Sequence, residues 1–181
     1  MNINQKSYIA VISALAFVLL AFTGQFNYTF RSLETGPVES FEKNCARCHG
    51  PHGSFYGTGF GSREHEELKK IVEEMMRGPA FLKPSEADIE AMTAYHHALS
   101  SGEPFICITR YDSSKQLLYG EAMLHNKLIG KKKDGETRTI SVDSTGKWQT
   151  KTSNASLLLK AENDSAVTTL NPGKNQWSHQ K

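Results

Sequence analysis

A stretch of five residues, CARCH at positions 45–49, constrains this chain more than any other part of its sequence. Two thiols three residues apart on a tight turn can each form a thioether bond to a porphyrin vinyl group, and the adjacent imidazole can then bind the iron. A zinc site needs four ligands, and the one remaining thiol, Cys107, is far away in the sequence. The motif therefore predicts one covalent haem c, with Cys45 and Cys48 as anchors and His49 as the proximal iron ligand.

Length and charge limit the alternatives. The chain has 181 residues, which suffice for one ordinary domain or two small ones. Its formal net charge of +2 gives no electrostatic argument for a nucleic-acid partner. Three cysteines are too few for a disulfide scaffold, so we expect Cys107 to be a buried free thiol.

The N-terminal segment indicates export. An almost uninterrupted apolar run covers residues 8–22 after Lys6. The run fits either the apolar region of a cleaved signal peptide or a short transmembrane anchor, and we keep both interpretations for residues 1–26. In either case the rest of the chain is expected to be periplasmic or extracytoplasmic, secreted or anchored by residues 8–22. Residues 27–37 are expected to form a linker.

Helical patterns dominate residues 38–102. A short helix over 38–44, with Phe41 facing the core, leads into the motif, and the glycine-rich residues 50–62 are expected to form a loop beside the haem. Residues 63–77 carry an apolar stripe typical of a helix, made of Leu68, Ile71, Val72 and Met75. A further helix begins after Ser85, whose partner in a capping box is Asp88, and ends at Gly102.

The order of these elements, together with the segments PAF at 79–81, SEADI at 85–89 and AYH at 94–96, resembles a class I cytochrome c over residues 38–101. The resemblance implies a mainly α cytochrome c domain that exchanges electrons with a redox protein partner. Members of that family usually place a distal methionine directly before the proline of this loop, but here Gly78 precedes Pro79.

The sixth iron ligand therefore has several candidates. Met76 is the first, because Met75 continues the apolar stripe and is expected to pack in the core, while Met76 is freer to turn toward the iron. Met75 itself and a histidine are alternatives. His96 lies on the apolar side of its helix, and His179, in the polar tail at 173–181, is a candidate if that tail docks instead of fraying. An open iron is the remaining alternative.

Beyond Pro104 the pattern changes to short alternating segments. Residues 105–111, 117–124, 137–142 and 147–152 read as strands, Trp148 is expected to face inward, and Asp134-Gly135 is a strong hairpin signal. With two more segments near 156–161 and 166–170, these predict a small all-β sandwich over residues 103–172. The segments LLYGEAM and VDSTGKW resemble bacterial immunoglobulin-like modules.

The expected function is that of an exported electron carrier, without catalytic residues of its own. Two alternatives remain open. One is a haem subunit of a membrane-bound or extracellular cytochrome assembly, anchored at the inner membrane. The other is an open-site haem peroxidase or gas sensor, which requires a vacant coordination position.

Overall fold

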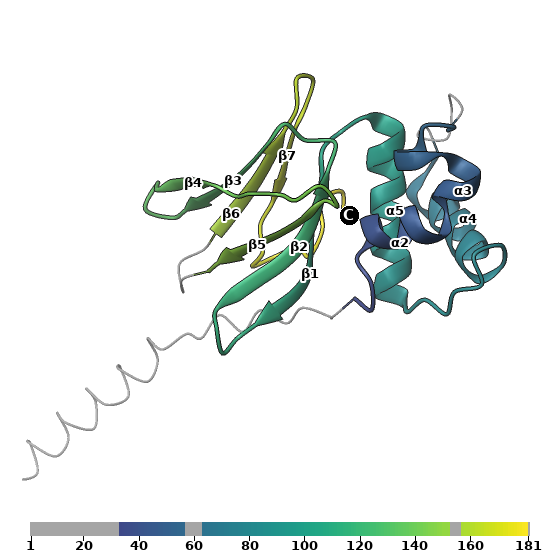
Figure 1. Ribbon diagram of the computed structural model, residues 1–181, viewed down its shortest axis with the longest axis horizontal. Coiled ribbons are helices and arrows are strands. Elements are labelled where there is room, and N and C mark those ends of the chain that lie inside the picture. The colour runs from purple at the N-terminus through teal and green to yellow at the C-terminus, as the bar shows by residue number, and fades with distance from the viewer. Residues whose placement is uncertain (1–32, 57–62, 153–156, 181) are drawn as a thin grey trace, which may run out of the picture.

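The computed structural model describes residues 33–56, 63–152 and 157–180 (Figure 1). Its helices come first along the chain and its strands follow. The helices are α2 (Pro37–Asn44), α3 (Ala46–His49), a 3₁₀ turn η1 (Pro51–Gly53), α4 (His65–Arg77) and α5 (Glu86–Ser101). The strands are β1 (Phe105–Asp112), β2 (Leu117–Met123), β3 (Lys127–Lys132), β4 (Thr137–Thr139), β5 (Lys147–Lys151), β6 (Leu157–Glu162) and β7 (Val167–Leu170).

The strands form two antiparallel sheets, with the orders β1-β2-β5 and β4-β3-β6-β7. The first sheet lies between the second sheet and the helices, so the molecule has a helical layer and two strand layers (Figure 1). The expected fold class, a mainly α cytochrome c domain with a small all-β immunoglobulin-like sandwich, is wrong, and the N-terminal signal or anchor helix expected with it lies outside the described residues. The described residues hold four short α-helices against seven strands. Glycine- and proline-containing connections keep the helices short, whereas strand alternation continues from Phe105 to Leu170.

Strand β1 connects the helical layer to the two sheets, because it contributes residues to two hydrophobic cores. Its residues alternate between the two faces of the sheet. Phe105 and Cys107 belong to the core beneath the helices, together with Phe41 and Tyr95. Ile106 and Ile108 belong to the core between the two sheets, which also contains Leu118, Leu128, Trp148, Leu159 and Leu170. One strand is therefore buried on both sides.

Local sequence signals account for most element ends. Ser85 and Asp88 form the expected capping box at the start of α5, and Gly102 adopts the left-handed conformation, with φ of 72°, at its end. Gly135 occupies the turn between β3 and β4 with φ of 92°. The predicted inward positions of Phe41 and Trp148 are confirmed, as is the burial of Cys107.

The C-terminal segment docks along β1. Ile108 N donates to Gln176 O at 2.8 Å, and Ser178 N donates to Ile106 O at 2.8 Å. Trp177, which lies opposite Cys107, is buried in the core beneath the helices. This segment therefore completes that core.

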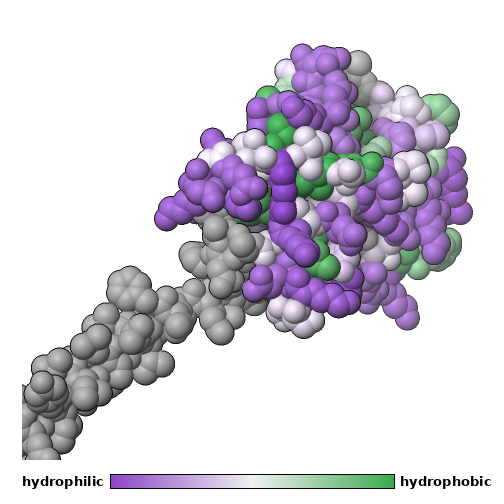
Figure 2. All heavy atoms as spheres, turned by 60° about the vertical axis from the view of Figure 1, so that its left-hand side comes forward, coloured by the Kyte–Doolittle hydropathy of each residue, from purple (hydrophilic) through white to green (hydrophobic). Residues whose placement is uncertain are grey.

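The face of the molecule drawn in Figure 2 is mainly polar. Hydrophilic side chains cover most of its area, and hydrophobic ones occur in small separate groups. Within the described part of the chain, no helix has the length and apolarity needed to cross a membrane. The apolar run at residues 8–22 lies outside the described residues, as does the expected linker up to residue 32.

Candidate haem site

The motif is carried by α3, which follows α2 almost without a break. Pro37 occupies the first turn of α2, where its fixed φ favours a helix start. Cys45 N donates to Phe41 O at 2.7 Å, and His49 N donates to Cys45 O at 3.1 Å, so the motif continues the helical path. Gly50 then turns the chain with φ of 73°. His49 thus ends its helix with its ring 6.4 Å from that of Phe41.

A carboxylate from the sheet supports this arrangement. Glu121, on β2, accepts hydrogen bonds from Val38 N at 2.8 Å and Glu39 N at 3.3 Å, both in the first turn of α2. Those amides have no partner inside the helix, so the carboxylate satisfies them. Desolvation by burial raises the pKa of Glu121 to about 7, although the two backbone hydrogen bonds oppose the shift.

A cavity of about 180 Å³ lies beside the motif. Its wall is mainly apolar and includes both motif cysteines, the motif histidine and two methionines; the lining residues are Asn44, Cys45, Arg47, Cys48, His49, Val72, Met75, Met76, Pro79, Ala80 and His96. The structure therefore brings the sequence-predicted anchors, the predicted proximal ligand and both methionine candidates to one cavity.

The methionines exchange the environments expected from the sequence. The buried residues of α4 are Leu68, Val72 and Met76, whereas Met75 is only partly buried. The expectation that Met75 continues the core stripe while Met76 lies off it is wrong. On a helix, positions three and four residues apart both lie near one face. Packing against α5 buries the positions four apart, Leu68, Val72 and Met76. Both side chains nevertheless line the cavity.

The loop after α4 closes one side of the cavity. The Arg47 guanidinium, inside the motif, donates to Pro79 O at 2.7 Å. Ala80 N donates to Met75 O at 3.1 Å, which folds the loop back on the helix end. Sequence reasoning did not assign a role to Arg47, because its partner is a backbone carbonyl that no side-chain pattern reveals.

His96 lies at the bottom of the cavity, on α5. It is 2% exposed, and its Nδ1 shares a short hydrogen bond with the Tyr56 hydroxyl. Burial, with a smaller contribution from the nearby His49, lowers the pKa of His96 to about 3. The imidazole is therefore neutral, and the prediction that it packs on the apolar side of its helix is confirmed.

The two motif cysteines differ in exposure. Both are free thiols, Cys45 partly buried and Cys48 exposed. Burial is the main cause that raises the pKa of Cys45, while the nearby Arg47 opposes it. At neutral pH Cys45 is therefore protonated in the absence of a covalent partner.

His179 does not line this cavity. It lies instead beside His97 and Glu103, at the far end of α5. Residues 57–62 of the expected glycine-rich loop lie outside the described residues. A comparison of the chain with models of protein families, with curated proteins and with solved structures finds no match in any of the three.

Proposed function

We propose that this chain is an exported mono-haem c-type cytochrome that carries single electrons to or from a larger redox protein. The observation that supports it is the convergence of Cys45, Cys48 and His49 with Met75 and Met76 on one apolar cavity. A zinc site or a thiol redox site would not require an apolar wall or two neighbouring methionine side chains. Haem c requires both thiols, an imidazole and an apolar surface for the ring.

Each group then has a separate role. Cys45 and Cys48 would hold the porphyrin through thioether bonds, and His49 would supply the proximal ligand to the iron. Met76 or Met75, which line the same cavity, would supply the further ligand. The haem, when bound, supplies reversible one-electron chemistry at its iron. A thioether ligand favours the reduced iron and so raises the potential.

The surrounding residues keep water away from that centre. Val72 and Ala80 contribute apolar wall, and Arg47 fixes the loop that carries Pro79 and Ala80. The cavity of about 180 Å³ is smaller than the ~300–1,000 Å³ of pockets that enclose ligands. These residues would therefore enclose only part of a haem, and the part left accessible would exchange the electron with a redox partner.

The test of haem attachment uses the full chain, produced in a bacterium that matures c-type cytochromes. We expect the denatured protein to retain haem stain on a gel, because the thioethers survive denaturation. Cys45→Ser and Cys48→Ser together should abolish the stain, whereas Cys107→Ala, which removes the thiol outside the motif, should preserve it. Wild-type protein that is folded and exported but carries no stain would overturn the proposal.

The test of the sixth ligand compares Met75→Leu with Met76→Leu, which preserve apolar volume. The variant that removes the ligand should lose the weak Met-to-iron band of the oxidised protein and shift its potential downward. If neither variant changes the spectrum, methionine is not the ligand. A high-spin wild-type spectrum that changes with CO would then favour the open-site peroxidase or gas sensor.

A further inference from the structure

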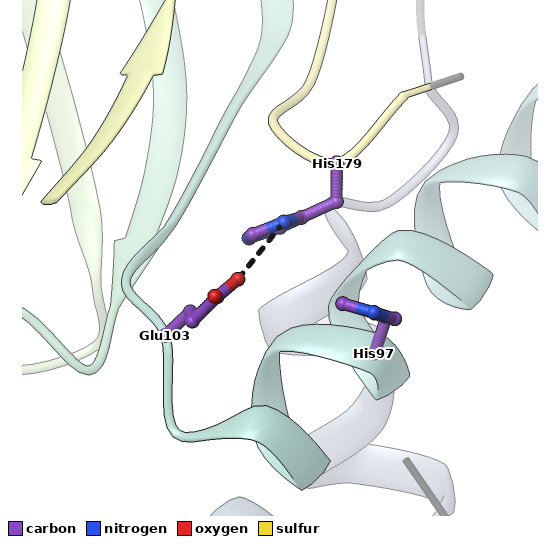
Figure 3. Close-up of side chains that lie close together, drawn as sticks. All are labelled: His97, Glu103 and His179. Atoms are coloured by element: carbon purple, nitrogen blue, oxygen red, sulfur yellow. Dashed lines mark ion pairs between the residues drawn. The ribbon is translucent and has the colours of Figure 1, made fainter. Parts of the chain in front are cut away.

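We propose that His97, Glu103 and His179 form a binding site for a divalent transition-metal ion such as Zn²⁺, separate from the haem cavity. His97 lies in the last turns of α5, Glu103 follows the end of that helix, and His179 belongs to the C-terminal segment. Figure 3 shows the three side chains pointing toward one another across the junction of helix and tail. One potential ligand atom from each lies within 4.8 Å of the others.

The distances suit a metal ion. His179 Nδ1 is 3.4 Å from Glu103 Oε2, and the rings of His97 and His179 are 5.2 Å apart between centroids. Two ligands that each lie ~2.1 Å from a tetrahedral zinc ion are about 3.4 Å from each other. Two imidazoles and one carboxylate are a common ligand set for zinc, with water in the fourth position.

The hydrogen bonds leave ligand atoms available. His179 Nε2 lies 3.3 Å from Pro104 O, so in the tautomer with its proton on Nε2 the ring donates to that carbonyl and Nδ1, which faces Glu103, keeps its lone pair for an ion. Metal-bound histidines typically donate their second nitrogen in this way. In addition, His97 Nδ1 is buried and has no hydrogen-bond partner among the described residues. Buried polar atoms without partners are rare, and a bound ion is one explanation for them.

The backbone holds His179 in place before any ion binds. Ser178, the preceding residue, is fixed to β1 by two hydrogen bonds with Ile106: its N donates to Ile106 O at 2.8 Å, and its Oγ accepts from Ile106 N at 3.0 Å. His179 itself has a φ of 61°, the left-handed region that non-glycine residues seldom adopt. A strained backbone that the surrounding structure maintains is frequent at binding sites.

Solvent can reach the site. The side chain of Glu103 is 44% exposed and that of His179 is 14% exposed. An ion can therefore enter without unfolding of the chain. Once bound, it would fasten the C-terminal segment to the end of α5 and stabilise the folded state by mass action.

The experiment is a calorimetric titration of ZnCl₂ into the chelator-treated full chain. We expect one ion per chain, with a thermal unfolding midpoint that rises when zinc is present. His97→Ala and His179→Ala should each weaken binding by more than the ~10–100-fold that is lost when a residue hydrogen-bonded to a metal ligand is removed. Glu103→Gln, at an exposed position, should fold normally and also weaken binding. His125→Ala, a histidine outside the cluster, should bind as the wild type does.

The motif cysteines require their own control, because unmodified thiols also bind zinc. The Cys45→Ser/Cys48→Ser variant should keep the site at full affinity. If that variant loses binding while His179→Ala retains it, the ion occupies the motif and the proposed site is wrong. It is also wrong if the wild type binds no zinc, or if the three cluster variants bind as tightly as the wild type. The stained gel decides separately whether haem is attached; where it is not, the stoichiometry and affinity of the proposed site are read from the Cys45→Ser/Cys48→Ser variant, in which the motif thiols are absent.

Discussion

A single buried carboxylate links the sheet to the helix that leads into the CARCH motif. Glu121 is 2% exposed, and its two oxygens satisfy backbone amides at the start of α2. Gly36, which precedes α2, lies so close that a Cβ there would overlap the carboxyl group. The charged groups that influence Glu121 are Glu39, which raises its pKa, and Lys147, which lowers it. These side chains form an ion pair with each other at 2.6 Å on the surface above.

Glu121 should give stability a definite dependence on pH. Its folded-state pKa of about 7 lies above the ordinary value of 4.5, so the folded chain binds this proton more tightly than the unfolded chain does. Stability should therefore fall as pH rises from ~4.5 to ~7, by up to ~3 kcal/mol at ~1.4 kcal/mol per unit, and change little above pH 7. The Glu121→Gln variant keeps an acceptor oxygen. Its free energy of unfolding, measured with urea, should not fall over this pH interval and should be larger than that of the wild type at pH 8.

The exposed Glu66 provides the matched control for that experiment. Glu66→Gln should retain the wild-type slope, because the side chain is in water in both states. Equal slopes in Glu121→Gln and the wild type would show that Glu121 does not titrate in this interval.

Gly120 is a second residue important for stability, because there is no room for a side chain at its position. Gly120 pairs with Trp148 across β2 and β5, and a Cβ at Gly120 would overlap both the Trp148 ring and Cys107 O. We expect Gly120→Ala to lower the free energy of unfolding by at least the ~1–3 kcal/mol typical of overpacking, because backbone on one side cannot yield. Denaturant unfolding followed by tryptophan fluorescence measures it. Gly173→Ala, where an added Cβ would meet one atom at an ordinary 3.4 Å, tests whether the cost comes from overlap or from a general loss of glycine.

Among the elements, α5 has the clearest local determinants. Ser85 Oγ accepts from Asp88 N at 3.2 Å, and Asp88 Oδ2 accepts from Ser85 N at 2.9 Å, so the helix start is satisfied from both directions. Its buried face includes Ile89, Met92 and Tyr95 and contributes much of the core beneath the helices. The element therefore combines a strong local start signal with extensive tertiary contacts.

Ser85→Ala should cost about 1 kcal/mol of unfolding free energy, the usual effect of removing a helix cap. Thermal unfolding followed by the helical circular dichroism signal measures the loss. Ser113→Ala, in the exposed turn between β1 and β2, should have an effect within ~0.5 kcal/mol. A Ser85 variant as stable as the Ser113 variant would mean that tertiary packing alone fixes the start of α5.

At the level of the whole molecule, the shared strand β1 makes the helices and the sheets depend on one another. Phe105 and Cys107 pack beneath the helices, while Ile106 and Ile108 pack between the sheets. Trp177 adds to the helical side from the opposite end of the chain. Loss of either core exposes one face of the same strand, so we expect helices and sheets to unfold together.

Trp177→Ala should reveal this coupling. The residue is 5% exposed, and truncation of a buried tryptophan usually costs ~3–5 kcal/mol. The unfolding midpoint should shift downward equally when followed by helical circular dichroism and by fluorescence of Trp148, in the other core. Separate transitions, with only the helical signal shifted, would contradict a shared core.

Local patterns were sufficient to locate many features of this protein. The capping box of α5, the hairpin turn at Gly135 and the inward position of Trp148 were all predictable, because each depends on residues close together in the sequence. The relative amounts of helix and strand, and the way in which they share a core, were not predictable in this way. The motif and the helical periodicity suggested a mainly α cytochrome c domain with a small separate β-sandwich, whereas seven strands form two sheets and strand β1 contributes to both cores.

The remaining features depend on contacts between distant segments. Packing against α5 determined which methionine of α4 is buried. Pairing of the C-terminal segment with β1 places His179 away from the cavity beside the motif and next to His97 and Glu103. Burial beneath α2 raised the pKa of Glu121. No periodicity or motif encodes these outcomes, since burial and electrostatic environment arise only when separate elements exclude water from one another.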